Sequence, residues 1–263
     1  MDERGITLRY DVDRTRLPLE LRSVFVELDA DASTRAWIDD ALTRRRPYAR
    51  MALRGAAMAF VNLYDANGWL SICQDRLLGT EQWRRLLGKG GASLLDVGAG
   101  DGTITQALAA LFDQVVTTEL SAPMARRLRA RGYACHQIDL AFDTIDGRFD
   151  VVALQNVIDR TTHPLRLLDG AAALLADGGR VVVAVPVPIE PGVFKGSAIL
   201  EPAEVIPAGI GNFEEAVTAL WTQVFEPRGY RVTALTRAPY LCNGSVRSRV
   251  EVLDDAIFVL AAD

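Results

Sequence analysis

The chain has few of the residues that build metal sites and disulfides. It contains three cysteines and two histidines among 263 residues. The cysteines, Cys73, Cys135 and Cys242, lie far apart and form no Cys-x-x-Cys pair. His136 and His163 fall in different predicted elements and lack the spacing of metal ligands. We therefore expect no metal and no disulfide framework, and we interpret the thiols as incidental groups in a reducing compartment.

The chain also lacks an excess of positive charge and any apolar run long enough to cross a bilayer. It has 29 basic and 34 acidic residues, a net charge of -5. A protein that follows a phosphate backbone is usually basic, so no nucleic-acid partner is expected. The longest apolar stretches, such as 181–185, have the length of strands, and charged residues interrupt the first 22 residues. These features predict a protein without a membrane span, in the cytoplasm or another soluble intracellular compartment.

The first part of the chain, residues 1–88, is predicted to be helical. Apolar residues recur there at the 3.6-residue spacing of a helix. Helices are expected over 18–28, after a cap at Ser33 or Thr34, over 50–64 with burial on more than one side, and from 80 to near Gly88.

From residue 89 to 263, short apolar strands alternate with helices, which predicts a parallel sheet covered on both faces. The predicted strands are 94–97, 115–118, 132–138, 149–154, 180–185, 230–235 and 254–260. Residues 186–211 are rich in proline and glycine and are expected to form a long loop. The last strand is expected to run antiparallel, because a hairpin-like loop separates it from its predecessor. The expected fold class is therefore α/β and Rossmann-like, with a seven-stranded sheet that ends in an antiparallel hairpin.

A glycine-rich turn follows the first of these strands, between Asp96 and Gly102. Glycine lets the backbone approach a ligand closely, and the N–H groups at the start of the next helix then face that ligand. The dinucleotide pattern G-x-G-x-x-G/A would need Gly or Ala where Thr103 stands. Asp96 lies just before the turn, where a carboxylate suits a sulfonium and an α-amino group better than a pyrophosphate. The spacing of Gly98, Gly100 and Gly102 therefore favours S-adenosylmethionine over NAD.

Two more carboxylates follow predicted strands. Glu119 stands after the second strand, where a carboxylate can accept both ribose hydroxyls of a nucleoside. Asp139 ends the third strand and is expected to accept from the adenine amino group. A solvated carboxylate at a strand end is the alternative interpretation of each. With the turn and the terminal hairpin, the pair indicates a class I methyltransferase that uses S-adenosylmethionine and releases S-adenosylhomocysteine.

Several segments of the chain follow a more particular pattern than the cofactor turn. They are Leu94–Gly102, Thr118–Ser121, Asn156–Arg160 (Asn-Val-Ile-Asp-Arg), Arg237–Cys242 (Arg-Ala-Pro-Tyr-Leu-Cys) and Val252–Leu260, with weaker matches at Ser23–Val26 and Asn67–Gly68. Through them most of the chain resembles the DREV-type methyltransferase-like family, known as protein-histidine N-methyltransferases. The resemblance implies methylation of the N1 (π) nitrogen of histidine in His-x-His segments of a protein or peptide substrate.

Asn156 and Asp159 follow the fourth strand at the carboxyl edge of the sheet, where ligands bind in such folds. Neutral imidazole, with a pKa of about 6.5, is already a nucleophile and needs orientation more than deprotonation. We expect Asp159 to accept from one ring N–H, which leaves the other nitrogen free, and to stabilise the cation that forms. Asn156 is expected to hold the ring or peptide, and Tyr240 to wall the acceptor pocket. The alternatives are a turn former for Asn156, a helix cap for Asp159 and hairpin packing for Tyr240.

The predicted organisation is an N-terminal helical cap, residues 1–88, and a class I methyltransferase domain, residues 89–263. Orientation of the reactants supplies most of the acceleration in such a transfer, and no metal is needed. Two alternative functions stay open. A small-molecule imidazole or amine N-methyltransferase would have a closed pocket, whereas an enzyme for peptides would have an open groove. A catalytically silent cofactor-binding subunit would have no physical reason to keep Asp96, Glu119, Asn156 and Asp159 together.

Overall fold

The computed structural model of the protein describes residues 5–45, 47–72, 74–195, 198–207, 211–243 and 248–262. Cys73, one of the three thiols considered above, lies outside these ranges. The helices of the described part are η1 (Arg14–Arg16), α1 (Leu19–Ser23), α2 (Ala32–Thr43), α3 (Tyr48–Ala57), α4 (Leu63–Leu70), α5 (Thr80–Leu87), α6 (Thr105–Ala109), α7 (Ala122–Ala130), α8 (Pro164–Ala173), α9 (Phe213–Leu220), η2 (Trp221–Phe225) and η3 (Glu226–Arg228).

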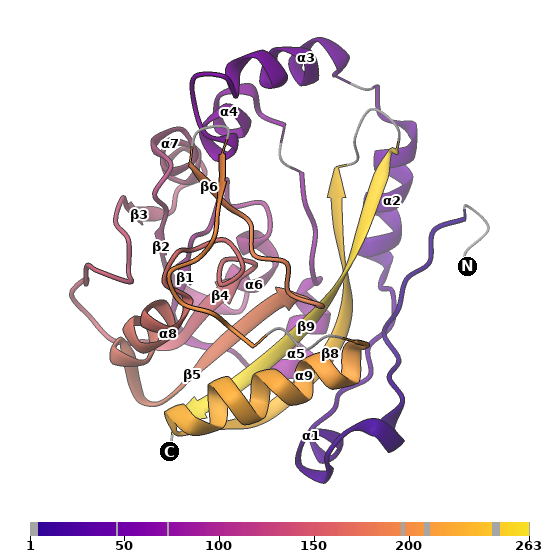
Figure 1. Ribbon diagram of the computed structural model, residues 1–263, viewed down its shortest axis with the longest axis vertical. Coiled ribbons are helices and arrows are strands. Elements are labelled where there is room, and N and C mark those ends of the chain that lie inside the picture. Colours follow the sequence, from indigo (N-terminus) through magenta and orange to yellow (C-terminus); the bar gives the residue numbers. More distant parts are fainter. Residues whose placement is uncertain are drawn as a thin grey trace.

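The described residues form a seven-stranded sheet in the order β3-β2-β1-β4-β5-β9-β8 (Figure 1). Its strands are β1 (Gly91–Val97), β2 (Phe112–Thr118), β3 (Ala134–His136), β4 (Phe149–Gln155), β5 (Leu175–Pro186), β8 (Tyr230–Asn243) and β9 (Val250–Ala262). Strands β1 to β5 pair in parallel, and β9 runs antiparallel to both β5 and β8. This is the predicted Rossmann-like sheet with its terminal hairpin, and the fold class is confirmed.

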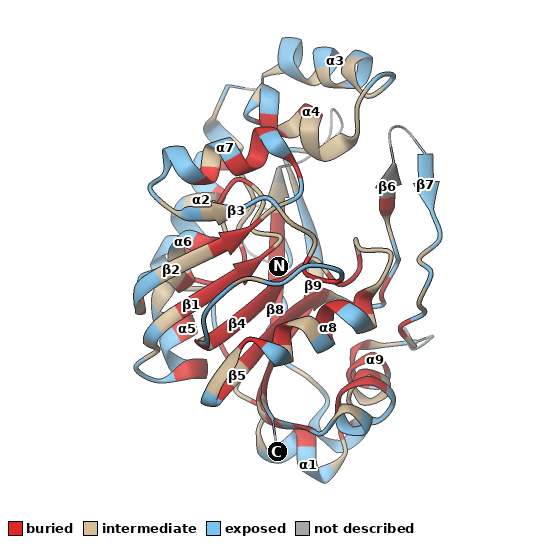
Figure 2. Ribbon diagram, turned by 90° about the vertical axis from the view of Figure 1, so that its left-hand side faces the viewer, coloured by how far each residue is buried: buried red, intermediate tan, exposed pale blue. Residues whose placement is uncertain are grey.

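The sheet separates two apolar clusters, one on each face. Val152 and Val181 belong to the cluster that packs against α8 and α9, whereas Val151 and Val182 belong to the cluster that packs against α5 and α6. Consecutive strand residues point to opposite faces, so an unbroken apolar run buries both sides of a central strand. Figure 2 shows the central strands buried between helices whose outer surfaces are exposed.

The N-terminal segment departs from the predicted helices. The helix expected over 18–28 ends at Ser23, and the chain then pairs with β8 through a parallel bridge between Phe25 and Leu235. The Val26 N–H donates to the Leu235 carbonyl at 2.8 Å, and the Leu235 N–H donates to the Val24 carbonyl at 3.1 Å. An edge strand offers unpaired backbone groups, and this extended segment satisfies part of them. Periodicity alone could not reveal this pairing.

Two further predictions in this segment were wrong. Helix α2 is capped by Asp31, whose Oδ1 accepts from the Thr34 N–H at 2.7 Å, so neither Ser33 nor Thr34 is the cap. The single buried helix expected over 50–64 is two helices, α3 and α4, of which α3 has no buried residue. The Asn62 side chain begins α4 by accepting from the Asp65 N–H at 2.8 Å.

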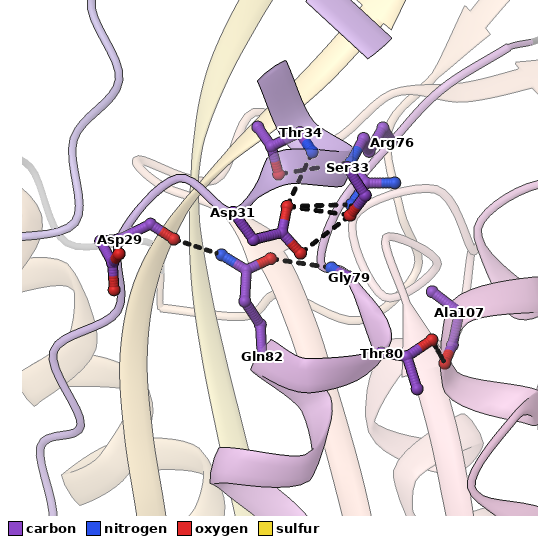
Figure 3. Close-up of polar contacts among 9 residues, drawn as sticks. All are labelled: Asp29, Asp31, Ser33, Thr34, Arg76, Gly79, Thr80, Gln82 and Ala107. Atoms are coloured by element: carbon purple, nitrogen blue, oxygen red, sulfur yellow. Dashed lines mark hydrogen bonds and ion pairs between the residues drawn. The ribbon is translucent and has the colours of Figure 1, made fainter. Parts of the chain in front are cut away.

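A polar network attaches the N-terminal segment to α5 (Figure 3). Gln82 donates to the Asp29 carbonyl and accepts from the Gly79 N–H. Asp31 forms an ion pair with Arg76 at 3.5 Å. The backbone of Arg76 in turn exchanges two hydrogen bonds with Leu241 of β8, each of 2.8 Å. This network therefore fixes residue 75, the neighbour of Arg76, against the hairpin.

The C-terminal half contains more regular structure than predicted. Strands β8 and β9 extend beyond 230–235 and 254–260, so that the Pro-Tyr-Leu-Cys segment lies within β8. The predicted loop over 186–211 includes two short antiparallel strands, β6 (Val193–Lys195) and β7 (Ala198–Leu200). Within the described residues no helix is long and apolar enough to cross a membrane, and no group of three His, Cys, Asp or Glu could hold a metal ion.

The predicted boundary near residue 88 falls between α5 and β1. Residues before this boundary also contribute to the core of the sheet domain: Leu21 belongs to one apolar cluster and Trp83 to the other. The division into 1–88 and 89–263 therefore stays a prediction.

Candidate active site

The glycine turn after β1 depends on backbone conformations that favour glycine. Gly98, Gly100 and Gly102 have φ values of 64°, 59° and 82°, in the left-handed region. A Cβ on Gly98 would lie 2.6 Å from a methyl of Val157, and one on Gly102 would lie 2.9 Å from Leu128. A Cβ on Gly100 would meet nothing within 4 Å. Of the three glycines, Gly100 therefore leaves open space where a ligand can approach the backbone.

Asp96, near the end of β1, is buried beneath this turn. The Thr105 hydroxyl donates to its Oδ2 at 2.6 Å, and the Gln155 amide donates to its Oδ1 at 3.1 Å. Burial raises the pKa of Asp96 to about 6, although the two hydrogen bonds favour the charged form. At neutral pH the group remains mostly ionised, and it connects β1 to α6 and β4.

Glu119 directly follows β2, and both of its carboxylate oxygens are held by backbone donors. Gly100 N–H donates to Oε2 and Ser121 N–H donates to Oε1, each at 2.8 Å. Burial raises the pKa of Glu119, and these backbone bonds oppose the shift. Each oxygen keeps a further lone pair, so the carboxylate can still accept from two neighbouring hydroxyls. Asp65 of α4, which sequence reasoning missed, accepts from the Ser121 hydroxyl at 2.6 Å.

Strand β3 is shorter than predicted and ends at His136, so Asp139 lies in the loop that follows it. Its side chain is half-buried, and its Oδ1 accepts from the Ala141 N–H at 3.0 Å. Asp139 and Glu119 line the same cavity.

Asn156 and Asp159 occupy the turn between β4 and α8. Asn156 has a left-handed φ of 54°, is 4% exposed, and has no hydrogen-bond partner for either side-chain atom in the described part of the chain. Asp159 is 8% exposed; its Oδ2 accepts from Arg160 Nε at 3.3 Å and its Oδ1 has no partner there. Burial raises the pKa of Asp159, and the Arg160 guanidinium opposes this. Asp159 does not cap a helix, because α8 begins at Pro164 after His163.

Tyr240 comes from β8, far away in the sequence, and is 2% exposed. Its hydroxyl donates to Asp75 Oδ2 at 3.0 Å, and the Arg160 guanidinium lies 6.0 Å from the centre of its ring. Burial raises the pKa of Tyr240 well above its usual value. Asp75 gave no signal in the sequence, because its partner is 165 residues away. Burial likewise raises the pKa of Tyr64 in α4 to about 12.

These side chains surround one cavity of about 1250 Å³. The predicted site residues that line it are Asp96, Gly98, Gly100, Glu119, Asp139, Asn156, Asp159 and Tyr240. Gly102 does not line it and instead packs against α7. Further lining residues come from α4, its N-cap and the chain after it, namely Asn62, Leu63, Tyr64, Asp65, Asn67, Trp69 and Asp75. The cavity joins the glycine turn to the polar groups after β4.

The chain is similar to known methyltransferases. A family model described as DREV methyltransferase matches residues 9–262, so the chain belongs to the DREV methyltransferase family. It is a methyltransferase that uses S-adenosylmethionine, as predicted.

Individual relatives are more distant. The ubiquinone biosynthesis O-methyltransferase of Xanthomonas campestris pv. campestris (strain B100) is 24% identical over 178 residues, which cover 62% of this chain and 73% of that protein. The demethylmenaquinone methyltransferase of Clavibacter sepedonicus is 33% identical over 129 residues, 46% of this chain and 52% of that one. A solved structure described under the conversion of a disulfide bond into a thioacetal group during echinomycin biosynthesis has a TM-score of 0.50 at 13% identity, covering 72% of this chain and 82% of that chain. That last likeness shows a shared fold alone.

Proposed function

We propose that this methyltransferase transfers a methyl group to the N1 (π) nitrogen of histidine in His-x-His segments of proteins. The observation that carries the proposal is the Asp159 carboxyl, which is nearly buried, lines the cavity, and has a free Oδ1 within the described residues. A buried polar atom without a partner is uncommon and points to a functional reason. An imidazole N–H is a suitable donor for such an oxygen.

The residues around the glycine turn fit the cofactor of the family. We assign the ribose hydroxyls to Glu119, the adenine amino group to Asp139, and the close backbone approach to Gly100. The buried charge of Asp96 favours a cation in this part of the cavity. When bound, S-adenosylmethionine supplies an electrophilic methyl group on a positively charged sulfur.

On the acceptor side, Asp159 fixes the tautomer of the ring. Its carboxylate accepts from the N3 (τ) N–H, so the N1 lone pair is free to form the new N–CH₃ bond. The ring becomes a cation in this step, and a preorganised carboxylate stabilises that charge where little water can screen it. The N3 proton leaves to solvent after the product is released. Burial raises the pKa of Asp159, and the Arg160 guanidinium opposes this rise and so favours the ionised form.

Tyr240 and Asp75 form one wall of the cavity. Because the Tyr240 hydroxyl donates to Asp75, its ring is fixed and its oxygen can still accept a hydrogen bond from a peptide. Asp75 is in turn held beside β8 by the backbone bonds of Arg76. We therefore assign shape and orientation to this wall, and charge stabilisation to Asp159.

A small-molecule acceptor is the second candidate. It is favoured by the names of the relatives, a ubiquinone biosynthesis O-methyltransferase and a demethylmenaquinone methyltransferase. A cavity of about 1250 Å³ exceeds the usual range of about 300–1,000 Å³ for a small-molecule site. It therefore has room for an acceptor beside the cofactor. A phenol must lose its proton to a base during transfer, whereas an imidazole nitrogen attacks directly. An imidazole acceptor therefore needs no base, only an oxygen such as the free Asp159 Oδ1 to accept its N–H.

Incubation with labelled cofactor and paired substrates tests the proposal. One set contains a His-x-His peptide and its two single His→Ala variants, and the other contains free histidine, histamine and a hydroquinone. We expect label in the His-x-His peptide and little in the small molecules. Label in the hydroquinone or the free imidazoles, with none in the peptide, would replace the proposal with the second candidate. A protein that binds the cofactor and labels neither set would be a silent subunit.

A further inference from the structure

Asp255 of β9 is a buried carboxyl that the methyl transfer above does not use. It is 0% exposed, and neither of its oxygens has a hydrogen-bond partner among the described residues. Its register places it between Pro186 of β5 and Ala238 of β8, in the interior of the sheet. Leaving a carboxyl without partners in such a place costs stability, so its presence needs an explanation.

The neighbours of Asp255 belong to the candidate site. Burial raises the pKa of Asp255 well above its usual value, while the Asn156 amide beside it favours the charged form. The charged groups around it are Asp159, which raises this pKa further, Arg160, which lowers it, and Asp254, which raises it. Burial and the nearby Asp159 thus favour the protonated form of Asp255, which has one O–H to donate. Asn156 lines the cavity, whereas Asp255 is not among the lining residues.

We propose that Asp255 is a positioning residue that acts through Asn156. Its carboxyl O–H donates to Asn156 Oδ1, which turns Asn156 Nδ2 toward the cavity to donate to a backbone carbonyl of the acceptor peptide. Asn156 lies close enough to Asp255 to affect its pKa. Both side chains are buried, and neither has a hydrogen-bond partner among the described residues. Hydrogen bonds of a catalytic site often close only when the substrate arrives.

This inference rests on the proposed peptide substrate and assigns separate roles to Asp159 and Asn156. Asp159 accepts from the imidazole N–H, whereas Asn156 donates to the peptide backbone. The left-handed backbone of Asn156 fits this role, because asparagine tolerates that conformation and its short amide is then held close to the chain. Specificity for a peptide over free histidine would thus come from Asn156, as oriented by Asp255.

Two substitutions at this position separate positioning from structure. Asp255→Val removes a buried polar group without partners, so its melting temperature should equal or exceed that of the wild type. Its KM for a His-x-His peptide should rise about tenfold, the scale of one neutral hydrogen bond, with cofactor affinity unchanged. Asp255→Asn keeps an N–H donor and should hold KM within about threefold of the wild type.

Asp254→Asn is the matched control on the same strand. Asp254 forms an ion pair with Arg237, and its side chain points to the opposite face from Asp255. Loss of this ion pair in Asp254→Asn should lower the melting temperature and leave the KM for the peptide unchanged. An unchanged KM in Asp255→Val, or an equal rise in Asp255→Asn and Asp255→Val, would overturn the inference.

A measurement without substrate keeps this test apart from the proposed function. The side-chain amide resonance of Asn156, assigned by its loss in Asn156→Asp, should shift strongly in Asp255→Val and only slightly in Asp255→Asn. If the wild type methylates no peptide, the proposed function fails. The Asn156 amide resonance and the melting temperatures would still test the contact between Asp255 and Asn156. No shift of the Asn156 amide in Asp255→Val would overturn it.

Discussion

Asp159→Asn separates charge from shape at the centre of the candidate site. The replacement has nearly the same volume, and its Oδ1 can still accept from Arg160 Nε, as the Asp159 Oδ2 does at 3.3 Å. At the other position, however, an N–H₂ group replaces the free Oδ1. It would face the imidazole N–H, donor against donor, and would bring no negative charge to the developing cation.

The expected loss follows from that missing charge. Removal of a preorganised electrostatic partner costs on the order of 3–4 kcal/mol, so turnover of a His-x-His peptide should fall by about 10²–10³. Cofactor affinity and melting temperature should stay near those of the wild type, because Asp159 caps no helix and α8 begins only at Pro164. Asp169→Asn, an exposed change on α8, is the control and should leave turnover unchanged. Turnover of Asp159→Asn within twofold of the wild type would refute the assigned role.

Three other predictions concern the cofactor and pH. Gly100→Val should abolish cofactor binding in calorimetry, because the valine side chain would enter the open space at Gly100. Gly178→Val is the control: Gly178 has a similar left-handed φ of 72° but does not line the cavity, so this variant should bind the cofactor normally. Glu119→Ala should weaken cofactor binding by about 1–3 kcal/mol, and equal affinity in the variant would make Glu119 only a structural carboxylate. Burial raises the pKa of Asp159, and both this group and the acceptor ring must be deprotonated, so kcat/KM should fall as pH decreases through their two pKa values. In Asp159→Asn the acid limb should keep only the titration of the acceptor imidazole, and an unchanged two-proton limb would contradict that assignment.

The sheet could be predicted from the sequence because its strands carry a direct signal. Central strands such as Val181–Val185 are apolar on consecutive residues, as burial on both faces requires. Asp96 lies near the end of β1, the turn around Gly98 follows β1, and Glu119 directly follows β2. Their positions at the edge of the sheet could therefore be predicted from the topology.

The rest depended on contacts between distant parts of the chain. Phe25 leaves the helical pattern because the edge of β8 pairs with it, and Leu235 is more than 200 residues away. Asp75 accepts from Tyr240, which is 165 residues away in the sequence, and Asp255 is a neighbour of Asn156 only in the folded chain. None of these side chains has a local pattern that distinguishes it from an ordinary turn or strand residue.

The central claim is that methyl transfer goes to the N1 (π) nitrogen of a histidine within His-x-His. The most direct measurement is to methylate such a peptide, hydrolyse it completely, and separate the two methylhistidine isomers by chromatography with mass detection. Because Asp159 is assigned to the N3 N–H, the account predicts the N1-methyl isomer in the wild type. Recovery of the N3-methyl isomer, or of no methylhistidine from a protein that binds the cofactor, would contradict it.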